Sequence, residues 1–207
     1  MSTAAAQRAT FKEAIELVGA GQVDRAEEVC RGALEEDPEN VNMLALLGAV
    51  QIKRRRYKDA ERWLSRAIDL APTFAKPHED LGFTLIQQNR AEEAVEVLRK
   101  ATRLDPTLEL AWLNLGKALA MLGEGKEADT AFEKSFSLNP TRMKLAHAAE
   151  HHKAGRLDEA TRLYKEVLHD NPNNVDALRM LGIIAYTASD IDAVSYTHLR
   201  AHETTSL

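Results

Sequence analysis

Three histidines form the one candidate metal cluster that precedes the last fourteen residues of the chain. His147, His151 and His152 lie in the stretch AHAAEHHKAG, where a helix would place His147 and His151 one turn apart on one face. A zinc site needs further ligands at finger-like spacing, or the HExxH arrangement, and neither accompanies these histidines. We therefore predict a polar or packing role for them and no metal ion.

The stretch GEGKEA, at residues 123–128, satisfies the GxGxxA pattern of dinucleotide-binding loops. A functional loop of that kind follows a β-strand and opens the helix of a βαβ unit. Here helical patterns stand on both sides of the stretch. The sequence therefore predicts a turn between two helices and no nucleotide site.

The densest basic run, KRRRYK at residues 53–58, has the composition of a nuclear-localisation or phosphate-binding patch. It lies between two predicted helices, where a solvated turn tolerates charge, and we favour that interpretation. The net charge of −5 gives no reason to expect a nucleic-acid partner.

Cys30 is the single cysteine, so the chain has no internal disulfide, which fits a reducing compartment. It occupies the apolar position that Leu64, Leu98, Phe132 and Tyr164 hold elsewhere, so we predict a small buried side chain and not a nucleophile. No Ser/His/Asp set or carboxylate pair stands out from the charged faces of the predicted helices. The sequence predicts no catalytic residue and no cofactor.

The elements that must position these residues are helices. The composition is 44% hydrophobic, 29% charged and only 5% aromatic, and it is rich in the strong helix formers Ala, Leu, Glu, Lys and Arg. No stretch approaches the roughly 18–20 apolar residues that span a bilayer, and the first residues lack the apolar core of a secretory signal. We expect an all-α, cytoplasmic protein without a membrane partner.

Small residues and prolines recur at a nearly fixed spacing. Prolines stand 34 residues apart at Pro38, Pro72, Pro106 and Pro140. Twelve residues before each proline stands an alanine: Ala26, Ala60, Ala94 and Ala128. Twenty-four residues before the last three stands a glycine, at Gly48, Gly82 and Gly116, with Ala14 in the first unit. Such self-similarity predicts a repeat protein.

Each unit has the apolar pattern of two helices joined by a tight turn. In residues 110–140 the side chains of Trp112, Leu115 and Leu119 share the face of a first helix, and Ala128 and Phe132 share that of a second. Gly116 and Ala128 lack bulk, which allows the two helices to cross closely.

These residues resemble the signature of the tetratricopeptide repeat (TPR) family. The matching positions are Trp112, Leu115, Gly116, Leu119 in place of the usual tyrosine, Ala128, Phe132 and Pro140. The resemblance extends over about five and a half repeats, from residue 7 to residue 193. It implies a right-handed α-solenoid of stacked antiparallel helix pairs, in which the first helix of each pair lines a concave, protein-binding groove.

We expect four segments in the chain. Residues 1–6 are predicted to be disordered, 7–140 to form four 34-residue repeats, 141–193 to form a shortened fifth repeat and the first helix of a truncated sixth, and 194–207 to be a tail. Two residues are missing between Pro140 and Pro172. Either the array kinks there, or one continuous solenoid absorbs the deletion in the turn near residues 139–143.

The predicted groove is lined by the outward positions of the first helices. These are Phe11, Lys12, Ile15, Asn42, Leu46, Ala49, Lys76, Glu79, Asp80, Phe83, Leu110, Asn114, Lys117, Arg179 and Ile183. TPR proteins that bind acidic C-terminal peptides use a Lys/Asn/Arg clamp at such positions, but Glu79 and Asp80 would repel a terminal carboxylate. The mixture predicts an extended or helical peptide ligand without a strong charge requirement.

The tail breaks the repeat. Residues 194–204, VSYTHLRAHET, resemble a translated sequencing adapter, so we treat residues 194–207 as an artefact. His198 and His202 within it have a zinc-like spacing that this resemblance makes accidental.

The resemblance implies a non-catalytic scaffold that binds a protein or peptide. Residues 78–106 and 145–186 are also similar to the arrays that precede the catalytic domain of bacterial TPR-containing sulfotransferases, so the alternative is the arm of a longer enzyme. The sulfate-donor loop of that family is absent from this chain. A glycosyltransferase arm is disfavoured, because only Asn114 fits its asparagine ladder. The uncapped end after residue 174 predicts fraying and self-association.

Overall fold

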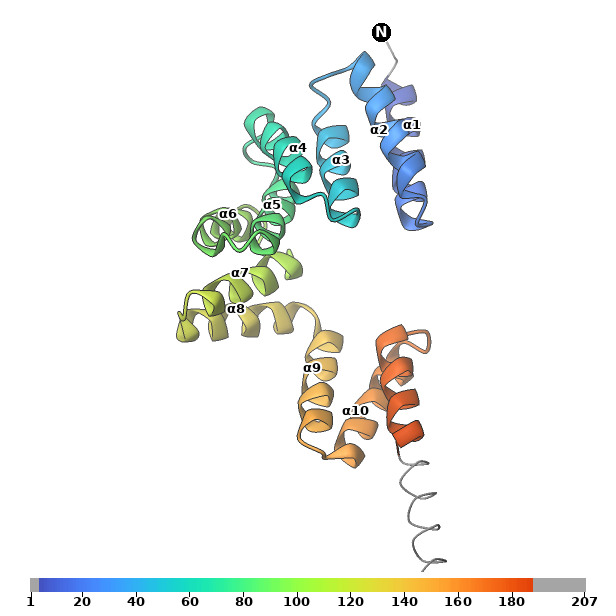
Figure 1. The fold of residues 1–207 in the computed structure, drawn as a ribbon, viewed down its shortest axis with the longest axis vertical. Helices are drawn as coiled ribbons and strands as arrows, with labels where there is room; N and C mark the ends of the chain where they lie inside the picture. The colour runs from blue at the N-terminus through green and yellow to red at the C-terminus, as the bar shows by residue number, and fades with distance from the viewer. Residues whose placement is uncertain (1–3, 188–207) are drawn as a thin grey trace, which may run out of the picture. The chain divides into compact units, whose positions relative to one another are not determined.

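A computed structural model describes residues 4–187, which are helical throughout apart from short turns (Figure 1). The helices are α1 (Ala4–Gly19), α2 (Val23–Glu36), α3 (Val41–Lys53), α4 (Tyr57–Leu70), α5 (Ala75–Gln87), α6 (Ala91–Leu104), α7 (Glu109–Met121), α8 (Gly125–Leu138), α9 (Pro140–Lys153) and α10 (Leu157–Asp170), followed by a helix at residues 175–187. The all-α prediction is confirmed. Residues 4–6 belong to α1, so the prediction of disorder is wrong for them. The predicted tail, with His198 and His202, lies outside the described residues.

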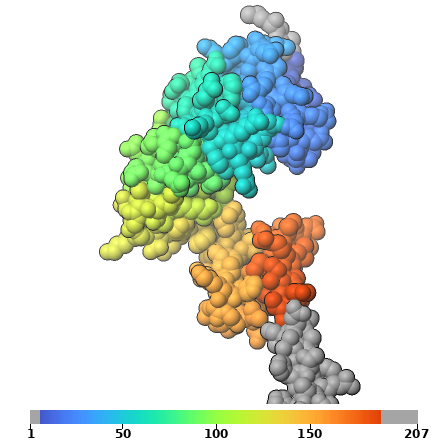
Figure 2. All heavy atoms as spheres, viewed as in Figure 1, coloured from blue at the N-terminus to red at the C-terminus, as the bar shows by residue number. Residues whose placement is uncertain are grey.

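The chain divides into two compact units, Met1–Leu138 and Asn139–Leu207. In the first unit α1–α8 form antiparallel pairs, and each pair packs on the next through α2 and α3, α4 and α5, or α6 and α7. Figure 2 shows these pairs as adjoining bands from blue to yellow. Within residues 4–138 the odd-numbered helices also contact one another in order, and no comparable contact joins the even-numbered helices. The odd-numbered helices therefore lie on the concave side of this α-solenoid.

Every helix pair closes with a residue in the left-handed region. These residues are Gly21, Arg55, Asn89, Gly123 and Gly155, with φ between 58° and 79°. The next residue then donates its N–H to a carbonyl five residues back, as Gln22 does to Leu17 and Arg56 to Gln51, both at 2.9 Å. This bond satisfies a carbonyl left open at the helix end and turns the chain back. GEGKEA and KRRRYK both contain such turns, as predicted.

Each pair crosses where its first helix has a small residue. A β-carbon added to Gly48, Gly82 or Gly116 would lie 2.3–2.6 Å from Leu64, Leu98 or Phe132 on the second helix. In the first pair Ala14 faces the smaller Cys30, and both are fully buried. Burial raises the pKa of the Cys30 thiol to about 11, which confirms a buried and unreactive side chain.

The second unit has a sparse core. In α9 only Ala148 is buried, because Lys144, His147 and His151 stand where α7 places Trp112, Leu115 and Leu119. Its buried side chains are Ala148, Ala160, Tyr164, Val167, Ala177 and Ile184. The link between α8 and α9 is the single residue Asn139, whose side chain accepts a hydrogen bond from the Arg142 N–H at 3.1 Å.

The candidate metal ligands have polar surroundings. The Arg156 Nε donates to His151 Nδ1 at 2.9 Å, and His147 is exposed. Within residues 4–187 no three His, Cys, Asp or Glu side chains gather as a metal site requires. In the same part of the chain, no helix is both long and apolar enough to cross a membrane.

Candidate functional site

An apolar cleft of about 230 Å³ opens on the concave side of the first unit, between α1, α3 and α5. Most of its wall is hydrocarbon, and Asn42, Lys76 and Asp80 add polar groups. The apolar side chains are Phe11, Ile15, Ala45, Leu46, Ala49 and Phe74.

The cleft exists because the middle helix has small residues where its neighbours have large ones. Ala45 and Ala49 of α3 stand 34 residues after Phe11 and Ile15 of α1, on the same helix face. A methyl group fills less of the space between neighbouring helices than a phenyl or an isobutyl group. Phe74, which directly precedes α5, packs against the core around Ala45 and closes the cleft from the other side.

Two carboxylates share one ammonium beside the cleft. The Lys76 Nζ donates to Asp80 Oδ1 at 2.8 Å and also to Glu79 Oε1. The Glu79 and Asp80 side chains are only 5% and 16% exposed, against 46% for Lys76. Burial raises the pKa of both carboxyls, although the contact with Lys76 opposes the shift. Burial alone would lower the pKa of Lys76, but Asp80 and Glu79 together raise it.

The cleft brings together several residues of the predicted groove. Its lining includes Phe11, Ile15, Asn42, Leu46, Ala49, Lys76 and Asp80. Sequence reasoning missed Ala45 and Phe74. Ala45 carried a signal, since it lies 34 residues after Phe11. Phe74 lies in a turn, where helical periodicity gives no information on direction.

Two predicted groove residues are buried, so the expectation that they face outward is corrected. Glu79 is 4% exposed, because its carboxylate lies beneath the Lys76 ammonium and stays paired there. Asn114 is 6% exposed on α7, a helix that is covered by α5, α6 and α8.

The remaining predicted residues do not line the cleft. Lys12 is exposed and pairs with Glu16 at 3.7 Å. Phe83 is half-buried, and Leu110 and Lys117 are exposed. In the second unit Arg179 pairs with Asp176 at 3.8 Å and Ile183 is exposed.

Four family models match the chain along most of its length. Models described as tetratricopeptide repeat match residues 17–78, 110–142 and 145–193, and one described as TPR repeat matches residues 84–123. Their repeats coincide with the helix pairs described above. The chain belongs to the tetratricopeptide repeat family.

Solved structures of other TPR proteins share this architecture. A thermophilic TPR protein of Thermus thermophilus, TTC0263, is 22% identical with a TM-score of 0.73 over 87% of this chain and 100% of its own, which shows the fold alone. PilF of Pseudomonas aeruginosa is 26% identical with a TM-score of 0.64, over 92% of this chain and 88% of its own. The Thermobaculum terrenum O-GlcNAc transferase is 32% identical with a TM-score of 0.55, over 57% of this chain but 23% of its own. A comparison with curated protein sequences found no match.

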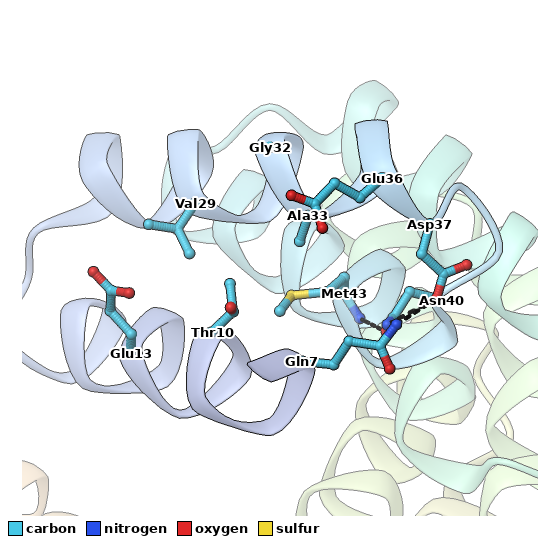
Figure 3. A pocket seen from close by; sticks show the side chains of 10 residues that line it. All are labelled: Gln7, Thr10, Glu13, Val29, Gly32, Ala33, Glu36, Asp37, Asn40 and Met43. Carbon is cyan, nitrogen blue, oxygen red and sulfur yellow. Dashed lines mark hydrogen bonds between the residues drawn. The ribbon is translucent and has the colours of Figure 1, made fainter. Parts of the chain in front are cut away.

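A second pocket, of about 280 Å³, lies between the two helices of the first TPR (Figure 3). Thr10 and Glu13 stand there on α1, where the next TPR has the core residues Leu44 and Leu47. Polar groups at its edge bond to one another, since Gln7 Nε2 and Asn40 Nδ2 both donate to Asp37 Oδ2 at 3.3 Å. Solenoid ends need a polar outer face, so we interpret this pocket as part of the end of the array.

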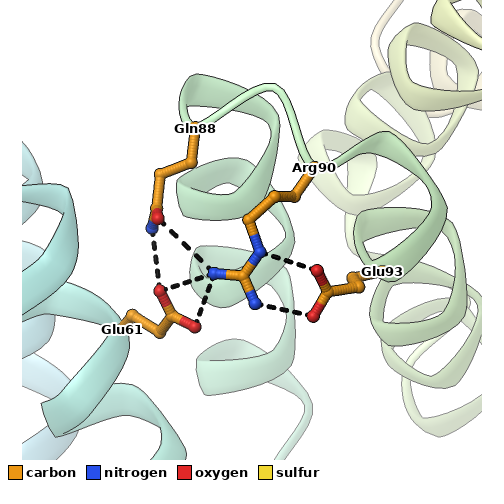
Figure 4. A network of polar contacts seen from close by, with 4 residues as sticks. All are labelled: Glu61, Gln88, Arg90 and Glu93. Carbon is orange, nitrogen blue, oxygen red and sulfur yellow. Dashed lines mark hydrogen bonds and ion pairs between the residues drawn. The ribbon is translucent and has the colours of Figure 1, made fainter.

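Consecutive TPRs are also joined by a charged network (Figure 4). Arg90, in the turn before α6, donates from Nη1 to both Glu61 oxygens at 2.7 and 2.8 Å. Its Nε and Nη2 each donate to a Glu93 oxygen at 2.6 Å. One guanidinium thus holds two carboxylates, and its hydrogen bonds lower the pKa of Glu93. Both acids serve as structural ion-pair partners.

Proposed function

We propose that this TPR protein is a non-catalytic scaffold, and that its concave cleft receives an apolar side chain from a peptide or a partner surface. The observation that carries the proposal is the apolar wall of the cleft. Ile15 is 46% exposed there, and burying hydrocarbon contributes about 25 cal/mol per Å² to binding. We place the scaffold in the cytoplasm, where a chain with a single cysteine needs no disulfide.

The architecture favours this mode of recognition. Helices that are stacked side by side present their inner faces as one extended surface, to which a helical or extended segment can bind. The cleft then provides a subsite for one anchoring side chain, as interfaces concentrate binding energy in a few buried anchors.

The test begins with a peptide selected from a random library against the full chain. Ile15→Asp puts a charge into the cleft wall and should weaken binding of the selected peptide by about tenfold or more, as measured by calorimetry. Leu70→Asp is the matched control, since it makes the same kind of change at an exposed leucine of α4. Equal affinity of wild type and Ile15→Asp would exclude the cleft as the binding site.

The second candidate function is the TPR arm of a longer enzyme. It is supported by the 32% identity with the O-GlcNAc transferase, which is confined to 23% of that protein. Long-read sequencing of the gene beyond codon 193 tests it. A frame that enters a sugar-donor or phosphosulfate-binding domain supports the arm, and one that ends after a capping helix supports a stand-alone scaffold. Turnover of a sulfate or sugar donor by this chain would overturn the non-catalytic proposal.

We also propose self-association through the helix at residues 175–187. Val175, Leu178 and Tyr186 on this helix are 74%, 50% and 69% exposed. Such an apolar face gains free energy when a second copy covers it. Light scattering should show oligomers that dissociate on dilution, and Leu178→Lys should shift the equilibrium toward monomer. A monomer at all concentrations would contradict this proposal.

A further inference from the structure

The charge distribution of the cleft specifies the kind of peptide that it takes, and this inference rests on the binding function proposed above. Asp80 lines the cleft, Glu79 precedes it on α5, and both carboxylates contact the Lys76 ammonium. We propose that the cleft binds a segment that carries a lysine or arginine beside a large apolar side chain. It disfavours a segment that ends in a free carboxylate.

The apolar half of this preference follows from the size and lining of the cleft. Its volume of about 230 Å³ is below the roughly 300–1,000 Å³ of most small-molecule sites, so it suits one side chain and not a whole ligand. Phe11, Ile15, Leu46 and Phe74 surround that space with hydrocarbon. A leucine, methionine or phenylalanine of the partner would fill it without leaving a polar group unpaired.

The basic half follows from the charge balance at Lys76. Two carboxylates face one ammonium, so a negative charge is left over in a place where little solvent reaches Glu79 or Asp80. Glu109 adds to the repulsion that Glu79 experiences. A cation brought by the partner would stabilise both carboxylates, and the low local dielectric makes that contact stronger than one at an open surface.

A terminal carboxylate meets the opposite situation. The other residues that line the cleft contribute no cation besides Lys76, whose ammonium already contacts both acids. Asn42 is the remaining polar side chain, and its amide is a weaker partner for an anion than a guanidinium or ammonium group. An acidic peptide would therefore be repelled, which gives the cleft specificity through charge.

The experiment uses three fluorescein-labelled peptides of about twelve residues that are identical except at one position. Each has an alanine-rich backbone with one leucine, and the residue beside it is arginine, glutamine or glutamate. Anisotropy titrations with the full chain should rank the affinities Arg, Gln, Glu, with about tenfold between the first and the last. Raising the salt concentration should reduce that ratio in the wild type, without any substitution.

Three variants separate charge selection from binding itself. Asp80→Asn keeps the shape of the side chain and should reduce the Arg/Glu affinity ratio by about threefold or more. Asp129→Asn removes the same charge from an exposed site on α8 and should leave the ratio unchanged. Ile15→Asp should weaken all three peptides equally.

Each result decides a different part of the proposal. If all three peptides bind equally well and Ile15→Asp weakens them, charge selection is wrong and the apolar cleft stands. If Asp80→Asn and Asp129→Asn reduce the ratio alike, the preference comes from net charge and the proposal fails. If none of the peptides binds, both the selection and the proposed function are overturned.

Discussion

At the scale of single residues, the array tolerates local departures from its own pattern, and these departures are measurable. Arg55 has φ of 58°, in a turn position where Gly21, Gly123 and Gly155 adopt the same conformation. The left-handed region costs a residue with a β-carbon about 1–2 kcal/mol. Arg55 is therefore held in place by the two helices on either side of it.

We expect Arg55→Gly to raise the free energy of unfolding by up to about 1 kcal/mol, since relief of strain exceeds the added entropy of the unfolded chain. Urea denaturation measures the change. Arg62→Gly, at an exposed position inside α4, is the control and should lower stability by about 1 kcal/mol. A loss of stability in both variants would show that Arg55 is not strained.

Gln51 is a second departure. It is 1% exposed on α3, and within residues 4–187 neither polar atom of its amide has a hydrogen-bond partner. Leu17, Leu85 and Leu119 occupy the corresponding position in the other TPRs of the first unit. An unpaired buried amide costs about 1–3 kcal/mol.

Gln51→Leu should therefore increase the free energy of unfolding by about 1–3 kcal/mol, because it replaces unpaired polar atoms with hydrocarbon. The exposed Gln87→Leu on α5 should change it by less than about 0.5 kcal/mol. Denaturant titration of both variants gives the comparison. A destabilised Gln51→Leu would mean that the amide has a partner, such as a buried water.

At the scale of helix pairs, packing depends on a match of sizes between two positions. Gly82 faces Leu98, whereas Ala14 faces Cys30 at the same place in the first TPR. The larger residue on the first helix thus goes with the smaller residue on the second. Glycine inside a helix is unfavourable by itself, so close packing has to compensate for it.

Gly82→Ala should lower stability by about 1–3 kcal/mol, because its β-carbon would lie 2.3 Å from Leu98 Cγ. The loss should be clearly smaller in a Leu98→Cys background, and a double-mutant cycle measures this coupling. Gly32→Ala is the control, since nothing lies within 4 Å of the added carbon, and it should gain up to about 1 kcal/mol. Equal losses in both backgrounds would rule out the size match.

At the scale of the whole molecule, stability should differ between the two units. The first contains four full TPRs with a leucine-rich core, whereas α9 in the second buries only Ala148. Local unfolding free energy follows the amount of buried apolar contact. The end of the array should open most easily.

Native-state hydrogen exchange tests this expectation. Amides at residues 175–187 should exchange faster than those of α5–α7, because most apolar side chains of this last helix are exposed. The measurement is made at low protein concentration, where self-association does not add protection. Equal protection of the two segments in a monomer would contradict the prediction.

The sequence by itself determined the repeat and its helix pairs. The 34-residue spacing of Pro38, Pro72 and Pro106, and the glycines that face bulky residues, act over a few turns of chain, so their effect can be read locally. The same periodicity identified Phe11, Ile15 and Leu46 as neighbours on one face, and the structure brings them to one cleft.

Only the tertiary structure decided how deeply each of those residues lies. Glu79 and Asn114 have the period of an exposed face, yet neighbouring helices and the Lys76 ammonium cover them. Phe74 enters the cleft from a turn, and the alanines of α3 form a cavity only because larger side chains flank them. Burial depends on what lies across from a residue, and helical period determines only the direction in which the residue points.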